Sequence, residues 1–289
     1  MSIQLIRTTN EHIPELARIM YDAFRCVAEQ HAFRSEIFSA EMAVGAMTSF
    51  VTRPDMYGVA ATLDGKIVGH NFLQMTDAVA GLGPICVDPH VQAKGIGRAL
   101  MQHVVEYGLK HHGPQVRLVQ EGFNMTSLSL YASVGFAVKE PLALMAVPPL
   151  ESAPGVRPLT QADVPAADAL QQRTQRVSRK NEIALMIEHG PAMGCVPHGL
   201  FEKGVLSGYC VPGFFGFGAA ESPEALQTAA QVAVKGFPPP LQRLILPTRQ
   251  SDLFALALQR KFKTLKVLQL MAVGPYDDGT GTWAPSIQY

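Results

Sequence analysis

Eight consecutive residues combine glycines with the start of a helix in a way that suits phosphate binding. They are Gln92, Ala93, Lys94, Gly95, Ile96, Gly97, Arg98 and Ala99. Glycine lets a backbone approach a bulky anion without a side chain in the way. The apolar residues Ile96, Leu100 and Val104 recur every fourth position and predict a helix. Its first N–H groups are unpaired and carry the positive end of the helix dipole, so the segment predicts a pyrophosphate cradle.

Two common phosphate loops do not fit this segment. A P-loop requires Gly-Lys followed by Ser or Thr, whereas Gly97 is followed by Arg98 and Ala99. A dinucleotide-binding loop requires Gly-x-Gly-x-x-Gly, and Leu100 stands where the third glycine should be. Taken alone, the segment is equally compatible with an ordinary strand-to-helix turn.

The pattern that fits is Gln/Arg-x-x-Gly-x-Gly/Ala after the strand end Val87-Asp88-Pro89. It resembles the coenzyme A pyrophosphate loop of the GNAT superfamily of N-acetyltransferases. Residues 124–136 resemble the second GNAT signature, with Asn124 ahead of a short helix that ends in Gly135-Phe136. These two motifs, in the expected order, give a GNAT resemblance that covers most of residues 1–147.

The resemblance implies a set of residues that bind acetyl-CoA. Backbone N–H groups of the loop would hold the pyrophosphate, and the strand 85–87 would pair with the pantetheine arm. The set is Ile85, Cys86, Val87, Gln92, Ala93, Lys94, Gly95, Ile96, Gly97, Arg98, Ala99, Asn124, Ser127 and Tyr131. Structural alternatives remain for three of them: Asn124 as a helix N-cap, Arg98 as a solvated helix residue and Cys86 as a small buried residue.

Acetyl transfer from a thioester to an amine requires a neutral amine and a proton for the departing thiolate. The resemblance implies that Tyr131 donates this proton, and the alternative is a tyrosine that packs beneath the Gly135-Phe136 turn. No general base is evident. Glu121 at a strand end is the first candidate, ahead of Asp77 and His70, unless the amine arrives already neutral.

Composition excludes several other classes of function. Lys+Arg and Asp+Glu are equal at 24 each, so neither a nucleic-acid surface nor an acidic tail is expected. No secretory signal or membrane-length apolar run is evident. The four cysteines form no Cys-x-x-Cys pair, which favours reduced thiols in a cytoplasmic protein and no metal site. Monomer and homodimer are both compatible with the sequence.

Apolar periodicity and turn residues predict the elements that position these motifs. In order they are strand 3–6, helices 9–30 and 40–51, strands 56–63 and 66–75 around Asp64-Gly65, strand 79–87, helix 96–111, strand 116–119, helix 127–134 and strand 142–147. This is the order of the GNAT fold. The expected fold class is therefore α/β (α+β), with a mixed, mostly antiparallel central sheet flanked by helices.

The chain repeats itself after a proline-rich linker at residues 148–155. Leu142–Val147 is matched by Leu268–Val273 at an offset of 126 (268 minus 142), and Phe136 falls on Phe262. Such a repeat predicts two copies of one domain. We expect an acetyltransferase domain at residues 1–147 and a degenerate GNAT-like domain at residues 156–289.

The second copy lacks the residues that would bind a cofactor. In place of the glycine loop it has residues 217–225, with Glu221 and Glu224 near the expected pyrophosphate position. At the repeat offset Tyr131 falls on Ala257 and Asn124 on Gln250. We expect this copy to be structural and to shape the acceptor cleft. Residues 286–289 are expected to form a free tail, or to reach the site as in some tandem relatives.

The sequence therefore predicts an acetyl-CoA-dependent N-acetyltransferase that moves an acetyl group directly to a primary amine. The acceptor would be a small molecule or an amino acid, bound near Tyr21, Arg25, Glu29, His31 and Phe33. Longer acyl donors remain possible. The alternatives are a coenzyme A-binding sensor without turnover and a purely structural module.

Overall fold

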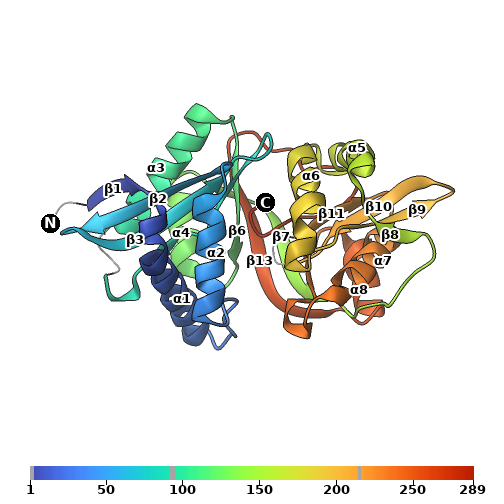
Figure 1. Cartoon of the computed structure of the whole chain (residues 1–289), viewed down its shortest axis with the longest axis horizontal. Coiled ribbons are helices and arrows are strands. Elements are labelled where there is room, and N and C mark those ends of the chain that lie inside the picture. Colours follow the sequence, from blue (N-terminus) through green and yellow to red (C-terminus); the bar gives the residue numbers. More distant parts are fainter. Residues whose placement is uncertain (1–2, 92–94, 214–215) are drawn as a thin grey trace. The chain divides into compact units, whose positions relative to one another are not determined.

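The computed structural model describes residues 3–91, 95–213 and 216–289, which divide into two compact units (Figure 1). The first unit contains residues 1–117 and 123–137, and the second contains residues 118–122 and 138–289. None of the helices in these described ranges is long and apolar enough to cross a membrane.

The first unit is a sheet with helices before and after its hairpin strands. Its elements are β1 (Ile3–Arg7), α1 (Ile13–Gln30), α2 (Ala40–Thr52), β2 (Met56–Leu63), β3 (Lys66–Gln74), β4 (Ala80–Leu82), β5 (Cys86–Val87), α3 (Ile96–His111), the start of β6 (Val116–Glu121) and α4 (Met125–Ser133). The strands follow the order β1-β2-β3-β4-β6, and β5 pairs with β3. All neighbours are antiparallel except β4 and β6, so the predicted mixed sheet is confirmed.

Local sequence explains the elements that frame this sheet. α1 is amphipathic, and its buried residues Leu16, Ile19 and Met20 share one face at helical spacing. α2 starts at Ser39, whose side chain accepts a hydrogen bond from the Met42 N–H. The β2–β3 turn places both Asp64 and Gly65 at positive φ, as a type I′ hairpin requires.

The prediction of one continuous strand at residues 79–87 is wrong. The structure has two short strands, β4 and β5, separated by residues 83–85. Gly83 has a φ of +133°, which suits glycine, and Pro84 has no N–H to donate to a ladder. The chain therefore changes direction between β4 and β5, each of which pairs with β3.

The second unit is also built from strands and helices. Its elements, besides β6 residues 118–121, are β7 (Ala137–Ala146), β8 (Val156–Pro158), α5 (Val164–Gln175), α6 (Lys180–His189), β9 (His198–Glu202), β10 (Val205–Val211), β11 (Phe217–Ala220), α7 (Pro223–Ala233), β12 (Arg243–Pro247), α8 (Ser251–Gln259), β13 (Lys263–Val273) and β14 (Thr282–Ala284). One sheet has the order β6-β13-β7-β12 and the other β14-β11-β10-β9-β8.

The internal repeat is visible in the elements themselves. α4 and α8 begin at residues 125 and 251 and end at 133 and 259, so both ends differ by the offset of 126 (251 minus 125). β7 and β13 begin at 137 and 263, which is again 126 apart. The first helices also start alike, because Thr9 and Thr160 each form a capping box before a proline-containing helix.

The compact units do not follow the two sequence copies. β7 ends the first copy by sequence, yet it lies between β13 and β12 and belongs to the second unit. Its ladder with β12 includes Leu144–Ile245 and Leu142–Pro247. The domain boundaries at residues 147 and 156 therefore remain a prediction about sequence copies, whereas the packing divides the chain elsewhere.

Candidate active site

The sheet of the first unit opens after β4. β4 runs parallel to β6 over only two residue pairs, Ala80–Val116 and Gly81–Arg117. β5 then pairs with β3 alone, through Gly69–Val87 and His70–Cys86. The other edge of β5 therefore has no ladder partner within the described ranges. An edge of this kind can receive an extended ligand as if the ligand were another strand.

The helix that follows begins without a side-chain cap. α3 starts after Gly95, which is exposed and has a φ of +77°, a conformation that glycine adopts easily. Among the described residues no side chain caps this start, and the first turn holds no acidic residue. Since the first N–H groups of a helix lack intrahelical acceptors, this end suits an anion. The predicted Gln92, Ala93 and Lys94 lie outside the described residues.

Gly97 has a packing role beside its predicted binding role. A Cβ at residue 97 would lie 3.2 Å from Leu130 Cδ2 and 3.8 Å from Val87 Cγ2. Glycine therefore lets α3 approach α4 and β5 closely. Ile96, next to it, is 1% exposed and anchors the helix start in the core. The structure thus brings three of the predicted segments together: the loop end, the strand 85–87 and the Asn124 helix.

The segment between β5 and the loop is fixed by an ion pair. Asp88 Oδ2 lies 2.6 Å from Arg18 Nη2 on α1, and Asp88 Oδ1 accepts a hydrogen bond from the His90 N–H at 2.9 Å. Burial raises the pKa of Asp88, but the hydrogen bonds from Arg18 and the His90 N–H, together with the nearby positive charge, hold this pKa below its usual range. This anchor holds the residues that precede the loop against α1.

α4 carries two of the predicted residues. Asn124 Oδ1 accepts a hydrogen bond from the Ser127 N–H at 3.0 Å, so the helix N-cap role of Asn124 is confirmed. Tyr131 is 7% exposed, and its ring centroid is 6.4 Å from that of Phe136. The helix ends at Ser133, and the chain turns at Gly135, which has a φ of +100°. Tyr131 therefore packs against the turn, and its role as an acid stays a prediction.

The candidates for the general base are engaged elsewhere. Glu121 belongs to the second unit, where its Oε1 lies 2.7 Å from Lys266 Nζ. His70 is fully buried and contacts the Leu16 carbonyl oxygen through Nε2 at 3.2 Å. Burial lowers the pKa of His70 to about 4, which keeps the ring neutral. Asp77 is also buried. Burial likewise raises the pKa of the Cys86 thiol, in line with a structural role.

A cavity of about 260 Å³ lies where α1 ends and the chain turns towards α2. It is lined by Tyr21, Arg25, Ala28, Glu29, Phe33, Arg34, Ser35, Ile37 and Phe38. Four of the five residues predicted for the acceptor side are in this lining. The fifth, His31, instead packs on Phe123 with ring centroids 5.0 Å apart. Arg34 was not predicted, because it lies in a segment without periodicity.

Part of the chain is similar in sequence to known acetyltransferases. Residues 14–136 match the model of the acetyltransferase (GNAT) family. A mycothiol acetyltransferase of Nocardiopsis dassonvillei is 32% identical over 114 residues, which are 35% of this chain and 33% of that protein. The chain therefore spans about a third of the length of this relative.

Two solved structures share the fold over nearly the whole chain. A proposed acetyltransferase from Pyrococcus horikoshii is 17% identical, with a TM-score of 0.72 over 99% of this chain and 94% of its own. A tandem GNAT protein from the clavulanic acid biosynthesis pathway is 13% identical, with a TM-score of 0.57 over 96% of this chain and 100% of its own. Residues 14–136 thus match the GNAT family, and nearly the whole chain shares the fold of these two structures. The predicted fold class is thereby confirmed for both copies.

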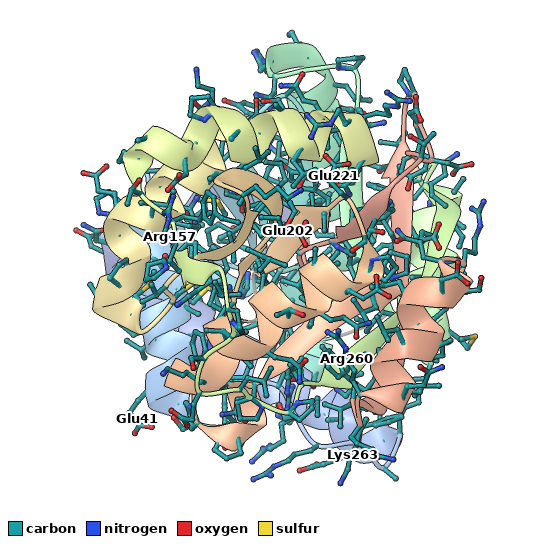
Figure 2. The ribbon with its side chains drawn as sticks, turned by 90° about the vertical axis from the view of Figure 1, so that its right-hand side faces the viewer. Glu41, Arg157, Glu202, Glu221, Arg260 and Lys263 are labelled. Carbon is teal, nitrogen blue, oxygen red and sulfur yellow. The ribbon has the colours of Figure 1, made fainter. Side chains whose placement is uncertain are left out.

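In the second copy, the helix that corresponds to α3 is α7, and its start has a side-chain cap. α7 begins after Ser222, whose Oγ accepts a hydrogen bond from the Ala225 N–H at 3.2 Å. Glu224 lies in its first turn, and Glu221, labelled in Figure 2, pairs with Arg173. A phosphate would meet a capped and negatively charged helix end here, which supports the prediction that this copy binds no coenzyme A.

In the second copy, the corresponding strand edge is paired with another strand of the same chain. β14 pairs antiparallel with β11 through Gly218–Ala284 and Ala219–Trp283. Gln250, the counterpart of Asn124, accepts a hydrogen bond from the Trp283 N–H through Oε1 at 3.4 Å. In the second copy, β14 therefore occupies the edge that corresponds to the unpaired edge of β5 in the first copy.

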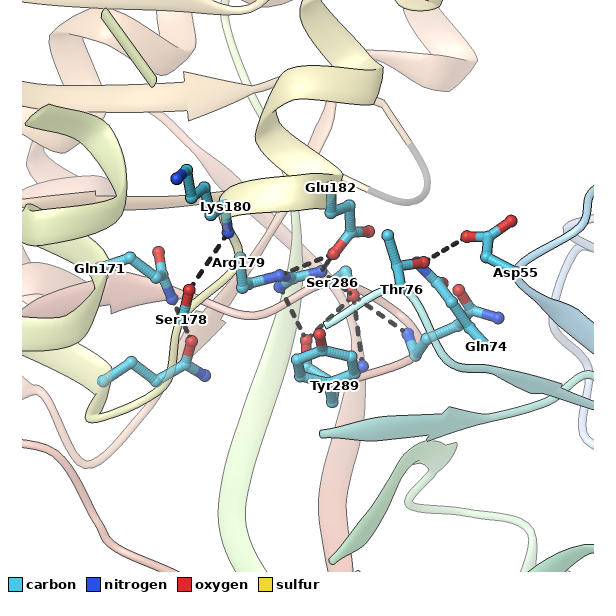
Figure 3. A network of polar contacts seen from close by, with 12 residues as sticks. Asp55, Gln74, Thr76, Gln171, Ser178, Arg179, Lys180, Glu182, Ser286 and Tyr289 are labelled. Atoms are coloured by element: carbon cyan, nitrogen blue, oxygen red, sulfur yellow. Dashed lines mark hydrogen bonds and ion pairs between the residues drawn. The ribbon is translucent and has the colours of Figure 1, made fainter. Parts of the chain in front are cut away.

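Residues 286–289 do not form a free tail. Arg179 is fully buried and donates hydrogen bonds to Glu182 Oε2 at 2.6 Å, to the Tyr289 carbonyl oxygen at 3.1 Å and to Ser286 Oγ at 3.1 Å (Figure 3). The guanidinium also lies over the Tyr289 ring, 4.3 Å from its centroid. The expectation of a free tail is wrong because this buried cation holds the segment in the second unit.

Proposed function

We propose that the first copy is an acetyl-CoA-dependent N-acetyltransferase and that it transfers the acetyl group directly to a primary amine. The observation that carries the proposal is the uncapped start of α3 beside the unpaired edge of β5. The first feature suits a pyrophosphate and the second an extended amide-bearing arm. The family match over residues 14–136 supports the same assignment.

In this proposal the residues of the loop and of the strand bind acetyl-CoA, and Tyr131 on α4 supplies the proton for the departing thiolate. Backbone N–H groups near Gly95–Arg98 hold the pyrophosphate, and residues 85–87 orient the thioester. The acceptor nitrogen forms the new C–N bond, the C–S bond breaks, and Tyr131 gives its hydroxyl proton to the thiolate. The nitrogen loses its own proton to a base that we do not assign, since Glu121 is paired with Lys266.

Titration with acetyl-CoA tests the binding step. We expect the native chain to bind one equivalent, and a Gly95→Val/Gly97→Val variant to lose binding by at least 100-fold. Valine at residue 97 would collide with Leu130, and valine at 95 would be strained at positive φ. Ser222→Ala at the second helix start is the matched control and should bind normally. Two equivalents per native chain, or none, would contradict the proposal.

A coenzyme A-binding sensor without turnover is the second candidate. It is favoured by the engagement of Glu121 and the burial of His70, which leave no assigned base. A Tyr131→Phe variant separates the two. The enzyme should keep its acetyl-CoA affinity and lose thiol release by 10-fold or more, whereas a sensor shows no thiol release in either protein.

A further inference from the structure

The cavity beside the end of α1 has an aromatic wall and an unbalanced charge. Tyr21, Phe33 and Phe38 contribute rings, and Arg25, Glu29 and Arg34 are the charged residues of the lining. At about 260 Å³ the cavity is smaller than the pockets that hold drug-sized ligands. It therefore suits a metabolite of the size of a single amino acid.

The two guanidinium groups differ in their neighbours. Arg25 lies 3.7 Å from Asp22 and 3.9 Å from Glu29, so its charge is partly balanced by weak, long ion pairs. Arg34 has no carboxylate partner within the described ranges. Its recorded contact places the guanidinium over the Phe38 ring, 5.6 Å from the centroid. The five N–H donors of Arg34 are thus available for an anion in the cavity.

The cavity shares a wall with the start of the helix that carries Tyr131. Phe33 stacks on Phe123 with ring centroids 4.3 Å apart and an interplanar angle of 17°. Phe123 directly precedes Asn124, the N-cap of α4. A small molecule held against Phe33 is therefore next to the segment from which the proposed acid emerges.

We propose that this cavity binds the acceptor and selects amines that also carry a carboxylate, with Arg34 as the ligand of that carboxylate. The inference rests on the proposed function, because it names the acceptor class of the same site. The aromatic wall favours an amino acid with an apolar side chain. A planar guanidinium binds a carboxylate through two parallel hydrogen bonds, which a neutral amide cannot reproduce.

Binding is tested without turnover. L-phenylalanine and L-phenylalaninamide are titrated into the chain saturated with coenzyme A. We expect the native protein to prefer the acid by at least tenfold, and Arg34→Gln to abolish that preference while the affinity for the amide is unchanged. Lys66→Gln, which removes an exposed charge elsewhere in the first unit, is the control and should keep the preference. Equal affinity for the two probes, or no binding of either, overturns the inference.

Turnover with the same probes separates this inference from the proposed function. Acetylation of acid and amide with equal kcat/KM overturns the acceptor class and leaves the transferase standing. A binding preference for the acid that Arg34→Gln removes, without acetylation of any amine, supports the cavity's ligand class and contradicts the transferase. Arg25→Gln should weaken acid binding less than Arg34→Gln, because carboxylates already flank Arg25.

Discussion

The two copies differ clearly at the start of one helix, which is α3 in the first copy and α7 in the second. α3 follows Gly95 without a side-chain cap, whereas α7 follows Ser222, whose Oγ accepts a hydrogen bond from the Ala225 N–H. The difference is only a few atoms, yet it decides whether the N–H groups are available to a ligand. A helix start is an anion site when its own residues leave it unsatisfied.

The neighbouring strand edges show the same contrast. The outer edge of β5 has no partner in the described part of the chain, whereas β11 pairs with β14. Gln250 binds the backbone of Trp283 from the position that Asn124 holds in the first copy. In the second copy a strand of the chain itself pairs with the edge whose counterpart in the first copy we propose as the ligand-binding edge.

The largest effect is expected from opening the filled edge. Trp283 is 2% exposed, and Trp283→Ala should lower the free energy of unfolding by about 4 kcal/mol through lost burial and a cavity. Urea denaturation measures the change. Leu258→Ala, at a residue that is 48% exposed, should cost under about 0.5 kcal/mol. Equal effects at the two positions would mean that β14 is not an integral part of the second unit.

Arg179 tests the cluster that holds residues 286–289. Arg179→Met leaves Glu182 buried without its cation, and we expect a loss of about 3 kcal/mol in unfolding free energy. Arg179→Met/Glu182→Gln should recover much of that loss, because it removes the uncompensated charge. A double variant as unstable as the single one would contradict this account.

His70, in the first copy, should make the stability of the protein depend on pH. Its pKa is lowered to about 4 in the fold, against about 6.5 in the unfolded chain, so the unfolded state takes up the proton first as pH falls. Stability is therefore full above about pH 6.5 and falls by about 3 kcal/mol towards pH 4. His70→Gln should flatten this slope in urea titrations between pH 4.5 and 7. An unchanged slope would assign the dependence to other groups.

The smallest effects compare the two helix starts directly. Gly95→Ala and Ser222→Ala should each cost about 1 kcal/mol, the first through strain at positive φ and the second through a lost cap. Only Gly95→Ala should weaken acetyl-CoA binding. If Ser222→Ala also changed that affinity, the separation of roles between the copies would fail.

Sequence patterns predicted the positions of helices and strands better than the contacts between distant residues. The repeat offset matched Leu142–Val147 to Leu268–Val273, which lie at the ends of β7 and β13, and the positions of α1, α2 and the β2–β3 hairpin agreed with the structure within a few residues. The break of residues 79–87 was missed because an apolar run outweighed Gly83-Pro84. The Glu121–Lys266 pair and the burial of Ser286 depend on residues more than a hundred positions away, which local patterns do not report.

The acceptor side shows the same limit. Tyr21, Arg25 and Glu29 were predicted for the acceptor side because the GNAT resemblance places the first helices there, and all three line the cavity. Arg34 follows the helix end, where backbone direction depends on packing. The sequence therefore suggested a mixed set of charges on the acceptor side. Among the described residues, the geometry pairs Arg25 with carboxylates and leaves Arg34 in the cavity lining without such a partner.

The interleaving of β6, β13, β7 and β12 affects how the chain is made. Synthesis of β7 is complete at residue 146, but both of its neighbours in the sheet lie beyond residue 242. Until those residues are synthesised, β7 is a bare, hydrophobic edge that can pair with other chains. A gene cut at the linker would preserve that hazard permanently. The strand order therefore favours making the two copies as one chain.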